Sequence, residues 1–466
     1  MRSASLAAAV ALMALPASTA LSATVPRTVG VIGGGIAGLS CARRLQQLGI
    51  EAIVYDTGKR GPGGRASSRM WRGRPADHAV QSVAATPGSA FHEWIGQLEA
   101  DGVVRSWSGL GVLDGQGFTA VASEGSAPRY IGVGGMGAIA DRLADGLDIK
   151  QDVWVSPNGG IKATATGWQV QESKRVQKPY DAVVVAHNGK CAERLTSKIP
   201  ARDVHMLLRA RFATAATGGG PGGGRMTLNS MYSLLLEVPV GILPSATARG
   251  GVDGAYVENE PALRYMGSND AKYGGDAAAS GPTECWTVLS SGAFGKSHKA
   301  PQEQLEGTAA ETEVTALLLA AVERAVGLPE GAVAKATVAT KLQLWGAAIP
   351  MNRWDGGEYV YSAGGRIGVA GDWLSTGPTA AASTVEAAWT SGLRLAEHMA
   401  SSTRCGDDCG LELGEGGGRF VPVDAGGFGS AGQGKANWVS EPGATGSSAS
   451  APKANKRSYT VRAGRG

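Results

Sequence analysis

The sequence predicts a mixed α/β fold, in which a domain built on a parallel sheet is interrupted by a mostly antiparallel β domain with helices. Near the N-terminus, Val29–Ile32 has the pattern of a buried strand, a helical stretch follows a glycine-rich turn, and Ile50–Tyr55 has the pattern of a second strand. In residues 201–346, strand patterns alternate with loops, and Glu303–Val326 is the one long helical stretch. Ile367–Ala370 then has a strand pattern and precedes a helix, which returns the chain to the first domain.

The turn after the first strand has the spacing G-x-G-x-x-G over residues 33–38. The first glycine of such a turn permits its tight bend, the second lets a pyrophosphate approach the backbone, and the third lets helix and strand pack closely. Asp56 follows the second predicted strand, roughly 20 positions after the first glycine. At this spacing an acid binds the adenosine ribose of a dinucleotide. The sequence therefore predicts a Rossmann-like dinucleotide site made of Gly33, Gly35, Ile36, Ala37, Gly38 and Asp56.

A second glycine-rich loop follows at Gly61-Pro62-Gly63-Gly64-Arg65. Its paired glycines bring backbone N–H groups close to a ligand, and the guanidinium of Arg65 would add a bidentate partner for a phosphate. Placed shortly after a dinucleotide fold, the loop favours FAD over NAD, because FAD folds of the amine-oxidase type carry such a loop. Gly64 and Arg65 are therefore candidate FAD-binding residues.

Composition argues against several other classes of protein. The 466 residues suit a cofactor domain plus a substrate domain. The net charge is only +4, and no basic stripe with interleaved aromatic residues is present, so a nucleic-acid partner is not expected. The six histidines are scattered without metal-ligand spacing, so no metal site is expected. The five cysteines do not form a disulfide framework at this length, although Cys405 and Cys409 could form a small bridge.

Residues 1–23 have the pattern of a targeting segment. Arg2 supplies a short basic region, Leu6–Ala17 is apolar, and Ser18-Thr19-Ala20 offers a cleavage site. The apolar stretch is too short to span a bilayer, and no later run in the sequence is long enough. No acid precedes Glu51, which also suits a transit peptide. The segment could be a secretory signal, a plastid transit peptide or a bacterial export signal, and the sequence does not distinguish these. The sequence also does not predict the oligomeric state.

The domain boundaries follow these patterns. The FAD-binding domain is predicted in three parts, residues 28–80, 130–190 and 347–400, with the substrate domain at residues 81–129 and 191–346. From residue 401 to residue 466 the chain is rich in Gly, Ser and Ala and has a basic end. Such a composition buries too little apolar surface to fold, so this stretch is predicted to be disordered.

The chain resembles the renalase-like branch of the flavin amine-oxidase superfamily, near its plant and algal FAD-dependent oxidoreductases. The similarity covers residues 28–400 in pieces. These are the two glycine-rich loops with Asp56, and the segments Asp77–Gln81, Tyr130–Met136, Leu344–Pro350 and Gly371–Trp373. The resemblance implies a Rossmann-like FAD-binding domain of the amine-oxidase type, interrupted by a mostly antiparallel substrate domain.

The resemblance also implies roles for single residues. The first turn would contact the pyrophosphate and Arg65 a phosphate, and Val155 would bracket the adenine through its backbone. Gly371 and Asp372 would reach the ribityl chain. The helix after Pro378 would direct its N-terminus at the C2 carbonyl of the flavin, where its dipole stabilises the negative charge of reduced flavin.

The chain departs from the family pattern at several positions. Ala79-Val80 stands where Gly-Ala is common, close to the expected flavin ring, and Ser82 stands where an aromatic residue is frequent. No lysine can be placed near flavin N5, where some amine oxidases hold one. The sequence therefore implies flavin binding more directly than amine oxidation.

The candidate residues of the substrate pocket are Gln81, Trp345 and Trp373. The two tryptophans could form walls of the pocket or belong to the core, since tryptophan is common in both places. His78 is adjacent to Asp77, and neighbouring residues of a strand point to opposite faces, which favours a structural role for this histidine. No nucleophile and base pair can be assembled, as expected for hydride transfer, which needs orientation and electrostatics.

These observations predict an FAD-dependent oxidoreductase that transfers a hydride from a small substrate, an amine or a dihydronicotinamide-like compound, to flavin N5, with dioxygen as the reoxidant. One alternative is an enzyme similar to carotenoid or prenyl-lipid desaturases, which the lack of a long apolar membrane-binding stretch disfavours. The other alternative is a flavin-binding escort protein without catalysis.

Overall fold

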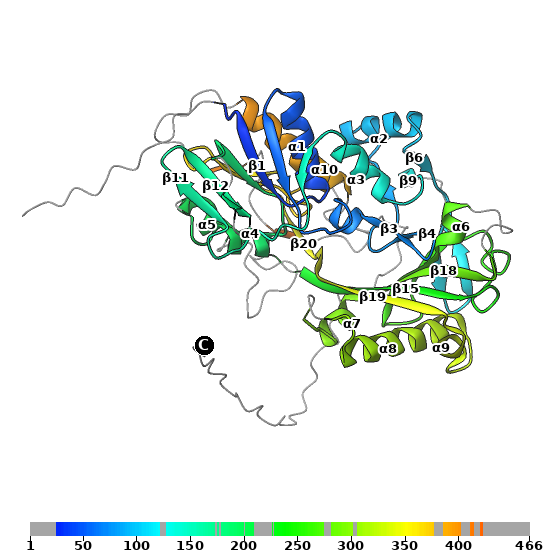
Figure 1. Cartoon of the computed structure of the whole chain (residues 1–466). Helices are drawn as coiled ribbons and strands as arrows, with labels where there is room; N and C mark the ends of the chain where they lie inside the picture. The colour runs from blue at the N-terminus through cyan, green and yellow to red at the C-terminus, as the bar shows by residue number, and fades with distance from the viewer. Residues whose placement is uncertain are drawn as a thin grey trace, which may run out of the picture.

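The computed structural model describes most of the chain, with gaps. The described residues are 25–121, 127–172, 175–176, 179–199, 201–208, 226, 228–274, 281–301, 305–376, 385–401, 411–413 and 420–422. The predicted targeting segment, Pro378, Cys405 and Cys409 lie outside them. Figure 1 shows a helix-covered sheet with α1 and α10 at the top and a second, curved sheet with α7, α8 and α9 below it.

The first sheet carries the parallel part of the fold. Its strands run in the order β10 (Asp148–Lys150), β2 (Glu51–Tyr55), β1 (Thr28–Ile32), β14 (Ala182–Val185), β22 (Ile367–Val369), β21 (Val360–Ser362) and β23 (Leu411–Leu413). Pairing is parallel from β10 to β22, and β21 pairs antiparallel with both of its neighbours. The run of valines in β14 is buried along its whole length, as expected for a strand covered on both faces.

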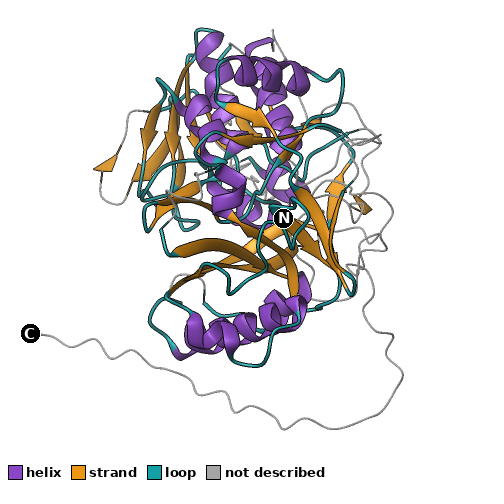
Figure 2. Ribbon diagram, turned by 90° about the vertical axis from the view of Figure 1, so that its right-hand side faces the viewer, coloured by secondary structure: helices purple, strands orange, loops and turns teal. Residues whose placement is uncertain are grey.

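The second sheet is mostly antiparallel. Its strands run in the order β19 (Ala339–Pro350), β15 (Leu228–Pro239), β18 (Thr283–Ser290), β17 (Leu263–Ser268), β16 (Gly254–Val257), β7 (Leu110–Asp114) and β8 (Gly117–Ala120). Only the β16–β7 pair among these is parallel. The outer layer consists of α7 (Gly292–Ser297), α8 (Ala309–Val326) and α9 (Ala332–Ala336), which Figure 2 shows at the bottom of the molecule.

The remaining elements connect the two sheets or cover the first. The small sheets are β5 (Val83–Ala84) with β9 (Arg129–Gly132) and β6 (Val104–Ser106), β3 (Ser68–Trp71) with β4 (Arg74–Asp77), β11 (Ile161–Thr164) with β12 (Gly167–Glu172) and β13 (Arg175–Val176), and β20 (Asn352–Trp354) with β24 (Phe420–Pro422). The helices are α1 (Ile36–Gln47), the short 3-10 turn η1 (Gly64–Ala66), α2 (Ala90–Ala100), α3 (Gly137–Ala144), α4 (Gly189–Thr196), α5 (Arg202–Leu207), α6 (Asn269–Tyr273) and α10 (Val385–Ser401).

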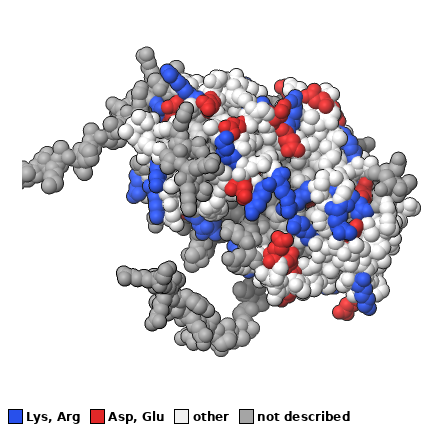
Figure 3. All heavy atoms as spheres, in the orientation of Figure 1, with Lys and Arg blue, Asp and Glu red and all other residues white. Residues whose placement is uncertain are grey.

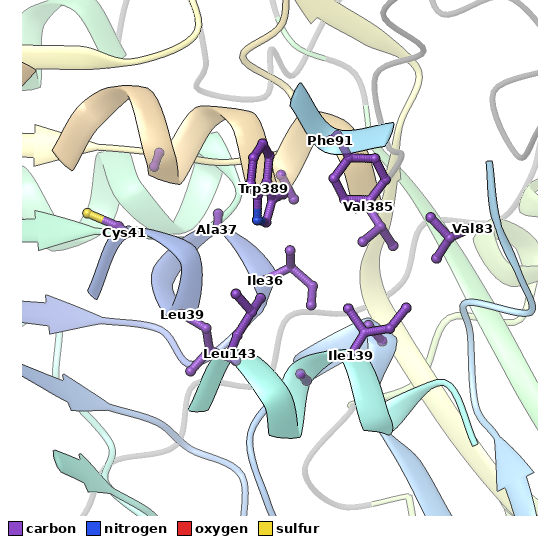
Figure 4. Close-up of a cluster of buried hydrophobic side chains, with 14 of the residues drawn as sticks. Ile36, Ala37, Leu39, Cys41, Val83, Phe91, Ile139, Leu143, Val385 and Trp389 are labelled. Carbon is purple, nitrogen blue, oxygen red and sulfur yellow. The ribbon is translucent and has the colours of Figure 1, made fainter. Parts of the chain in front are cut away.

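The helices around the first sheet meet in a continuous apolar cluster. Figure 4 shows Ile36 of α1, Ile139 of α3, Phe91 of α2 and Trp389 of α10 within it. Helices α1 and α10 pack so closely that a Cβ atom added at Gly392 would lie 2.1 Å from the carbonyl oxygen of Ala37. This packing fixes the first turn of α1, on which the candidate site depends.

The predicted fold class is confirmed. The sequence patterns of Val153–Val155 and Trp168–Gln171 also predict two strands that pair with each other, and this prediction is wrong. Strand β12 pairs instead with β11 and β13, and residues 153–155 belong to no strand. Strands β11 and β12 are joined by a two-residue loop, which closes at a much smaller entropic cost than a pairing with the more distant segment.

The long helix also starts later than its pattern predicts, at Ala309 and not at Glu303. The hydroxyl of Thr308 accepts a hydrogen bond from the backbone N–H of Glu311, and the Glu311 carboxylate accepts one from the N–H of Gly307. These bonds satisfy donors that the helix start leaves open, so the cap at Thr308 defines the first turn.

Two short segments of the predicted disordered stretch are ordered. Strand β23 pairs with β21, and strand β24 pairs with β20. Leu411, Leu413 and the apolar run Phe420–Pro422 are surrounded by Gly, Ser and charged residues, which obscure them in the average composition. The prediction of a structureless tail is therefore wrong at these positions.

The paired segments give a first testable expectation. Removing residues 402–466 should lower the melting temperature by about 2–4 °C, because β21 and β20 lose backbone hydrogen-bond partners. Removing only residues 423–466 keeps both segments and serves as the matched control. Equal melting temperatures of the two truncated proteins, measured by circular dichroism, would contradict the stabilising role of β23 and β24.

Two further observations concern the length of the helices and the charges on the surface. Among the residues that the structure describes, no helix is long and apolar enough to cross a membrane. Figure 3 shows basic and acidic side chains mixed over one face, with a group of basic ones near its middle, which agrees with the small net charge of +4.

Candidate flavin site and substrate pocket

The glycine turn between β1 and α1 has the geometry of a phosphate cradle. Gly33 has a φ of +113°, and a Cβ atom there would lie 2.5 Å from the carbonyl oxygen of Ala186. A Cβ atom at Gly38 would lie 1.9 Å from the carbonyl oxygen of Gly33, so helix and strand pack without room for a side chain. A Cβ atom at Gly35, by contrast, would meet no atom of the described residues within 4 Å. The turn thus offers open space to a ligand at its second glycine, where Ile36 and Ala37 begin α1.

Asp56 lies at the carboxyl end of β2, beside this turn. Its Oδ1 atom accepts a hydrogen bond of 3.3 Å from the backbone N–H of Gly34, and the residue is 9% exposed. Burial raises the pKa of Asp56, and hydrogen bonds from the backbone N–H groups of Gly34, Gly58 and Thr57 oppose that shift. The carboxylate therefore stands where an acceptor for ribose hydroxyls is expected.

The second glycine-rich loop packs directly on the first. The N–H of Gly63 donates to the carbonyl oxygen of Gly34 at 2.7 Å, and Gly63 and Gly64 have φ values of +112° and +55°. A Cβ atom at Gly64 would lie 3.6 Å from the Cα atom of Gly35. The two loops therefore form one surface around the open space at Gly35.

Arg65 and Asp372, predicted as separate ligand contacts, form an ion pair. The Nη1 atom of Arg65 lies 2.7 Å from Oδ2 of Asp372 and also donates to the carbonyl oxygen of Ala348 at 2.6 Å. Burial opposes the charge of Arg65, but the nearby carboxylate of Asp372 outweighs it and raises the pKa of the guanidinium. The pair joins the second glycine loop to the segment that follows β22. A ligand that binds one of the two side chains would therefore also lie in the electric field of the other.

Gly371 and Trp373, the two neighbours of Asp372, are hydrogen-bonded to residues of the core. The N–H of Gly371 donates to Oγ of Ser391 on α10 at 2.9 Å. Trp373 is fully buried, and its indole N–H donates to the carbonyl oxygen of His187 at 3.0 Å. Burial lowers the pKa of His187 to about 4, so its ring is neutral at neutral pH. The structure places Trp373 within the core.

Val155 lies in the loop that follows β10 and is buried in the apolar cluster on the other face of the first sheet. Two residues earlier, the N–H of Val153 donates to the carbonyl oxygen of Asp56 at 2.9 Å. The loop of Val155 thus runs beside the candidate ribose acid, on the side where an adenine would be expected.

A small pocket, open to solvent on one side, lies between the second sheet and the loop after β4. Its walls combine apolar, aromatic and polar side chains, namely Gln81, Ser82, Met231, Tyr256, Arg264, Tyr265 and Leu289. Met231, Tyr265 and Leu289 belong to the same apolar cluster as α1, so the pocket adjoins both domains. Of the three pocket candidates from the sequence, only Gln81 is a direct wall of this pocket.

Trp345 is close to the pocket without lining it. It stands opposite Met231 in the β15–β19 pair, so the two side chains share one face of the sheet. Its indole N–H is buried and has no hydrogen-bond partner among the described residues. This tryptophan therefore presents an open donor on the face of the sheet that carries the pocket.

A buried polar network supports Gln81, and sequence reasoning missed its central lysine. Oδ2 of the fully buried Asp77 lies 2.6 Å from Nζ of Lys272 and also accepts a bond from the hydroxyl of Tyr273. Nζ of Lys272 reaches Oε1 of Gln81 at 3.4 Å, while Nε2 of Gln81 donates to the carbonyl oxygen of Asp77 at 3.2 Å. The ion pair therefore fixes the orientation of the Gln81 amide.

The charge state of this network follows from its burial. Burial lowers the pKa of Lys272, although the adjacent carboxylate of Asp77 acts in the opposite direction. The other oxygen of Asp77 accepts bonds from Oγ of Ser68 and from the N–H of Met136. Each oxygen of this carboxylate thus has partners, as a buried charge requires.

His78 is fully buried, and neither of its ring nitrogens has a hydrogen-bond partner among the described residues. Burial, followed by the charge of Arg69, lowers its pKa to about 3, so the imidazole is neutral at neutral pH. A histidine with so low a pKa does not act as an acid or base near pH 7. This agrees with the structural role expected from its position beside Asp77. In the described part of the chain, no group of His, Cys, Asp and Glu could hold a metal ion.

Comparison with known proteins agrees with this architecture. The NAD(P)-binding Rossmann-like domain family matches residues 31–98. Putrescine oxidase bound to putrescine superimposes with a TM-score of 0.51 at 12% identity, covering 80% of this chain and 98% of the oxidase. The chain has the fold of the amine oxidases. Cyclohexylamine oxidase from Brevibacterium oxydans IH-35A matches with a TM-score of 0.52 at 12% identity, over 80% of this chain and 99% of the other.

A further structure with this amine-oxidase fold is a protein from Exiguobacterium sp. 255-15 described as a protoporphyrinogen oxidase. Its TM-score is 0.54 at 10% identity, and the match covers 81% of this chain and 99% of the other. At such identities the comparison establishes a common fold and leaves the substrate to be argued from the site itself.

Proposed function

We propose that this protein is an FAD-dependent oxidoreductase that removes a hydride from a small substrate. The observation that carries the proposal is the open space at Gly35, bordered by the second glycine loop and lying next to Asp56. In an amine-oxidase fold, a cradle of this shape suits the pyrophosphate and ribose of FAD. Bound there, the flavin would accept the hydride at N5 and pass the electrons to dioxygen.

The residues of the site have distinct tasks in this proposal. The N-terminus of α1 and the N–H groups of the turn would bind the pyrophosphate, and Asp56 would accept hydrogen bonds from the ribose. Asp372 would hold the ribityl chain with its orientation fixed by Arg65. Val155 would bracket the adenine. Gln81, oriented by Lys272, would position the substrate in the adjoining pocket.

Within this fold we assign the chain to the renalase-like branch, with an amine or a dihydronicotinamide-like compound as the substrate. The segments Asp77–Gln81 and Leu344–Pro350 support this assignment by their resemblance to that branch. Anaerobic mixing of the purified protein with a panel of amines, dihydronicotinamides and their isomers tests it. Bleaching of the flavin absorption by one class is the expected result, and a flavin that no compound of the panel reduces would contradict it.

The ion pair gives a quantitative prediction for cofactor binding. Asp372→Ala should weaken FAD binding roughly tenfold to a hundredfold, because hydrogen bonds to charged groups contribute about 1.5–3 kcal/mol. Titration of the apo-protein with FAD measures the effect. Asp101→Ala, which removes an exposed carboxylate paired with Arg142, is the control and should leave the affinity unchanged. An unchanged affinity for Asp372→Ala would exclude its contact with the cofactor.

A further inference from the structure

One half-buried histidine lies between the two parts of the candidate flavin site. His187 follows shortly after β14, and β14 lies between β1, which leads into the glycine turn, and β22, which leads into Gly371 and Asp372. The carboxyl ends of parallel strands meet at one edge of a sheet, and open α/β sheets bind their ligands there. The fold therefore places His187 at the edge where the dinucleotide is expected.

Two close approaches locate this histidine more narrowly. A Cβ atom at Gly33 would lie 3.5 Å from Nε2 of His187, so the imidazole is in contact with the glycine turn. A Cβ atom at Gly371 would lie 3.2 Å from the carbonyl oxygen of His187, and the same oxygen accepts the hydrogen bond from the indole N–H of Trp373. The backbone of His187 is thus fixed beside Gly371, while its ring reaches the turn.

The imidazole of His187 has no hydrogen-bond partner among the described residues. Burial lowers its pKa to about 4, although the residue keeps part of its surface accessible. A ring that is strongly desolvated without being sealed in the core lines a recess of the protein. At neutral pH the ring is uncharged, so one of its nitrogens carries a hydrogen that it can donate to a ligand.

The helix after His187 adds positive potential to this edge of the sheet. Helix α4 starts two positions further along the chain. Lys190 in its first turn has no ion-pair partner among the described residues, and after burial the nearby charges of Arg194 and Lys299 lower its pKa. Cations without a paired acid, beside the N-terminus of a helix, favour a bound anion.

We propose that the ring of His187 binds the pyrophosphate of the dinucleotide, on the side that leads from the glycine turn to Asp372. The N–H groups of the turn and of α1 would hold the pyrophosphate from one side. The imidazole N–H would donate to a phosphate oxygen from the neighbouring strand. The inference rests on the proposed function, and it adds a binding residue that the glycine fingerprint does not contain.

A pyrophosphate in contact with His187 couples FAD binding to the uptake of a proton. A negative charge beside an imidazole favours the protonated ring, so the bound ligand should raise the pKa of His187 from about 4 toward neutrality. Because the pKa is then higher in the complex than in the apo-protein, the affinity for FAD is highest at low pH. It falls as the pH rises through the pKa of the complex.

Other titratable groups on the surrounding elements also lie near the site. They are the side chains of Lys190, Cys191, Asp56, Arg65 and Asp372. All of them stay in place when only His187 is replaced. The difference between the unaltered protein and a His187 variant therefore isolates the contribution of the imidazole.

Calorimetric titration of the full-length apo-protein with FAD measures both the affinity and the proton uptake. Repeating the titration in two buffers with different ionisation enthalpies gives the number of protons taken up for each FAD bound. The unaltered protein should bind FAD several-fold to about tenfold more tightly at pH 6 than at pH 8.5, with a measurable proton uptake at pH 6.

Three variants locate the effect. His187→Leu should weaken FAD binding about tenfold or more at both pH values, as expected when a hydrogen bond to a charged group is lost. His187→Gln keeps an N–H donor without a titratable ring, so it should bind FAD like the unaltered protein at pH 8.5 and lose the proton uptake at pH 6. His92→Gln on α2 is the matched control and should keep both quantities. Circular dichroism confirms that each variant is folded.

The outcomes separate the two proposals. An FAD affinity that is unchanged in folded His187→Leu, or a proton uptake that persists in folded His187→Gln, would overturn the role of His187 and leave the proposed function standing. NAD and ADP-ribose, which also carry a pyrophosphate, are titrated in parallel. If they bind with a proton uptake that depends on His187 while FAD does not bind, the role of His187 is supported and the proposed function is overturned. Binding of none of the three would overturn both.

Discussion

Replacing Lys272 by methionine should lower the free energy of unfolding by about 3–5 kcal/mol, the range for breaking a buried ion pair by removal of one partner. Lys272 is 2% exposed and Asp77 is fully buried. The substitution leaves the carboxylate with neutral donors only, from Ser68, Tyr273 and the N–H of Met136. Chemical denaturation measures the loss. It should be among the largest effects of any single substitution in this chain.

A second substitution shows whether the pair itself is responsible. Asp77→Asn combined with Lys272→Met removes both charges, and it should recover part of the stability that Lys272→Met alone loses. Lys335→Met, at an exposed lysine of α9, should change the free energy of unfolding by no more than about 0.5 kcal/mol. The single variant Asp77→Asn is measured as well. If the double variant loses as much free energy of unfolding as Asp77→Asn and Lys272→Met lose together, the two residues act independently.

Gly35→Val should abolish FAD binding while leaving the protein folded. Gly35 has extended dihedrals, φ −77° and ψ 176°, which any residue can adopt, and in the described part of the chain a Cβ atom there meets no other atom within 4 Å. The valine side chain would occupy the space that the pyrophosphate needs. The variant should retain less than about a tenth of the bound FAD at a nearly unchanged melting temperature of the apo-protein, in line with the small effect of substitutions that meet no neighbours.

Two other glycines make this experiment specific. A Cβ atom at Gly96, exposed on α2, also meets none of the residues that the structure describes within 4 Å, so Gly96→Val should bind FAD normally. Gly38→Val should fail to fold, because its Cβ would lie 1.9 Å from the carbonyl oxygen of Gly33. Normal FAD content in folded Gly35→Val would place the cofactor elsewhere.

The parts of the site that are local in sequence could be predicted from it. The glycine turn and Asp56 lie within one strand–helix–strand unit, in which spacing determines position. Arg65 and Asp372 were each identified, but their ion pair joins residues 307 positions apart, and spacing carries no information about such a contact. Both residues were therefore predicted as separate partners of the ligand.

The lysine and the arginine of the pocket region could not be predicted for different reasons. Lys272 belongs to a short helix without an apolar repeat, and its partner Asp77 lies 195 positions away. In a regular strand, Arg264 and its neighbour Tyr265 would point to opposite faces. The register shift between Leu263 and Tyr265 in the β17–β18 pair marks a β-bulge, which lets both side chains line the pocket. Trp345 and Trp373 have equal hydrophobic character, so the pattern could not separate the one near the pocket from the one in the core.

The identity of the nucleotide that the protein carries decides whether the glycine turn and Asp56 form a flavin site. Protein lacking residues 1–23 is purified, denatured and freed of the polypeptide, and the released small molecules are identified by mass spectrometry and absorption. We expect FAD, close to one molecule per chain. Release of NAD alone, or of no nucleotide from protein offered FAD during refolding, would contradict it.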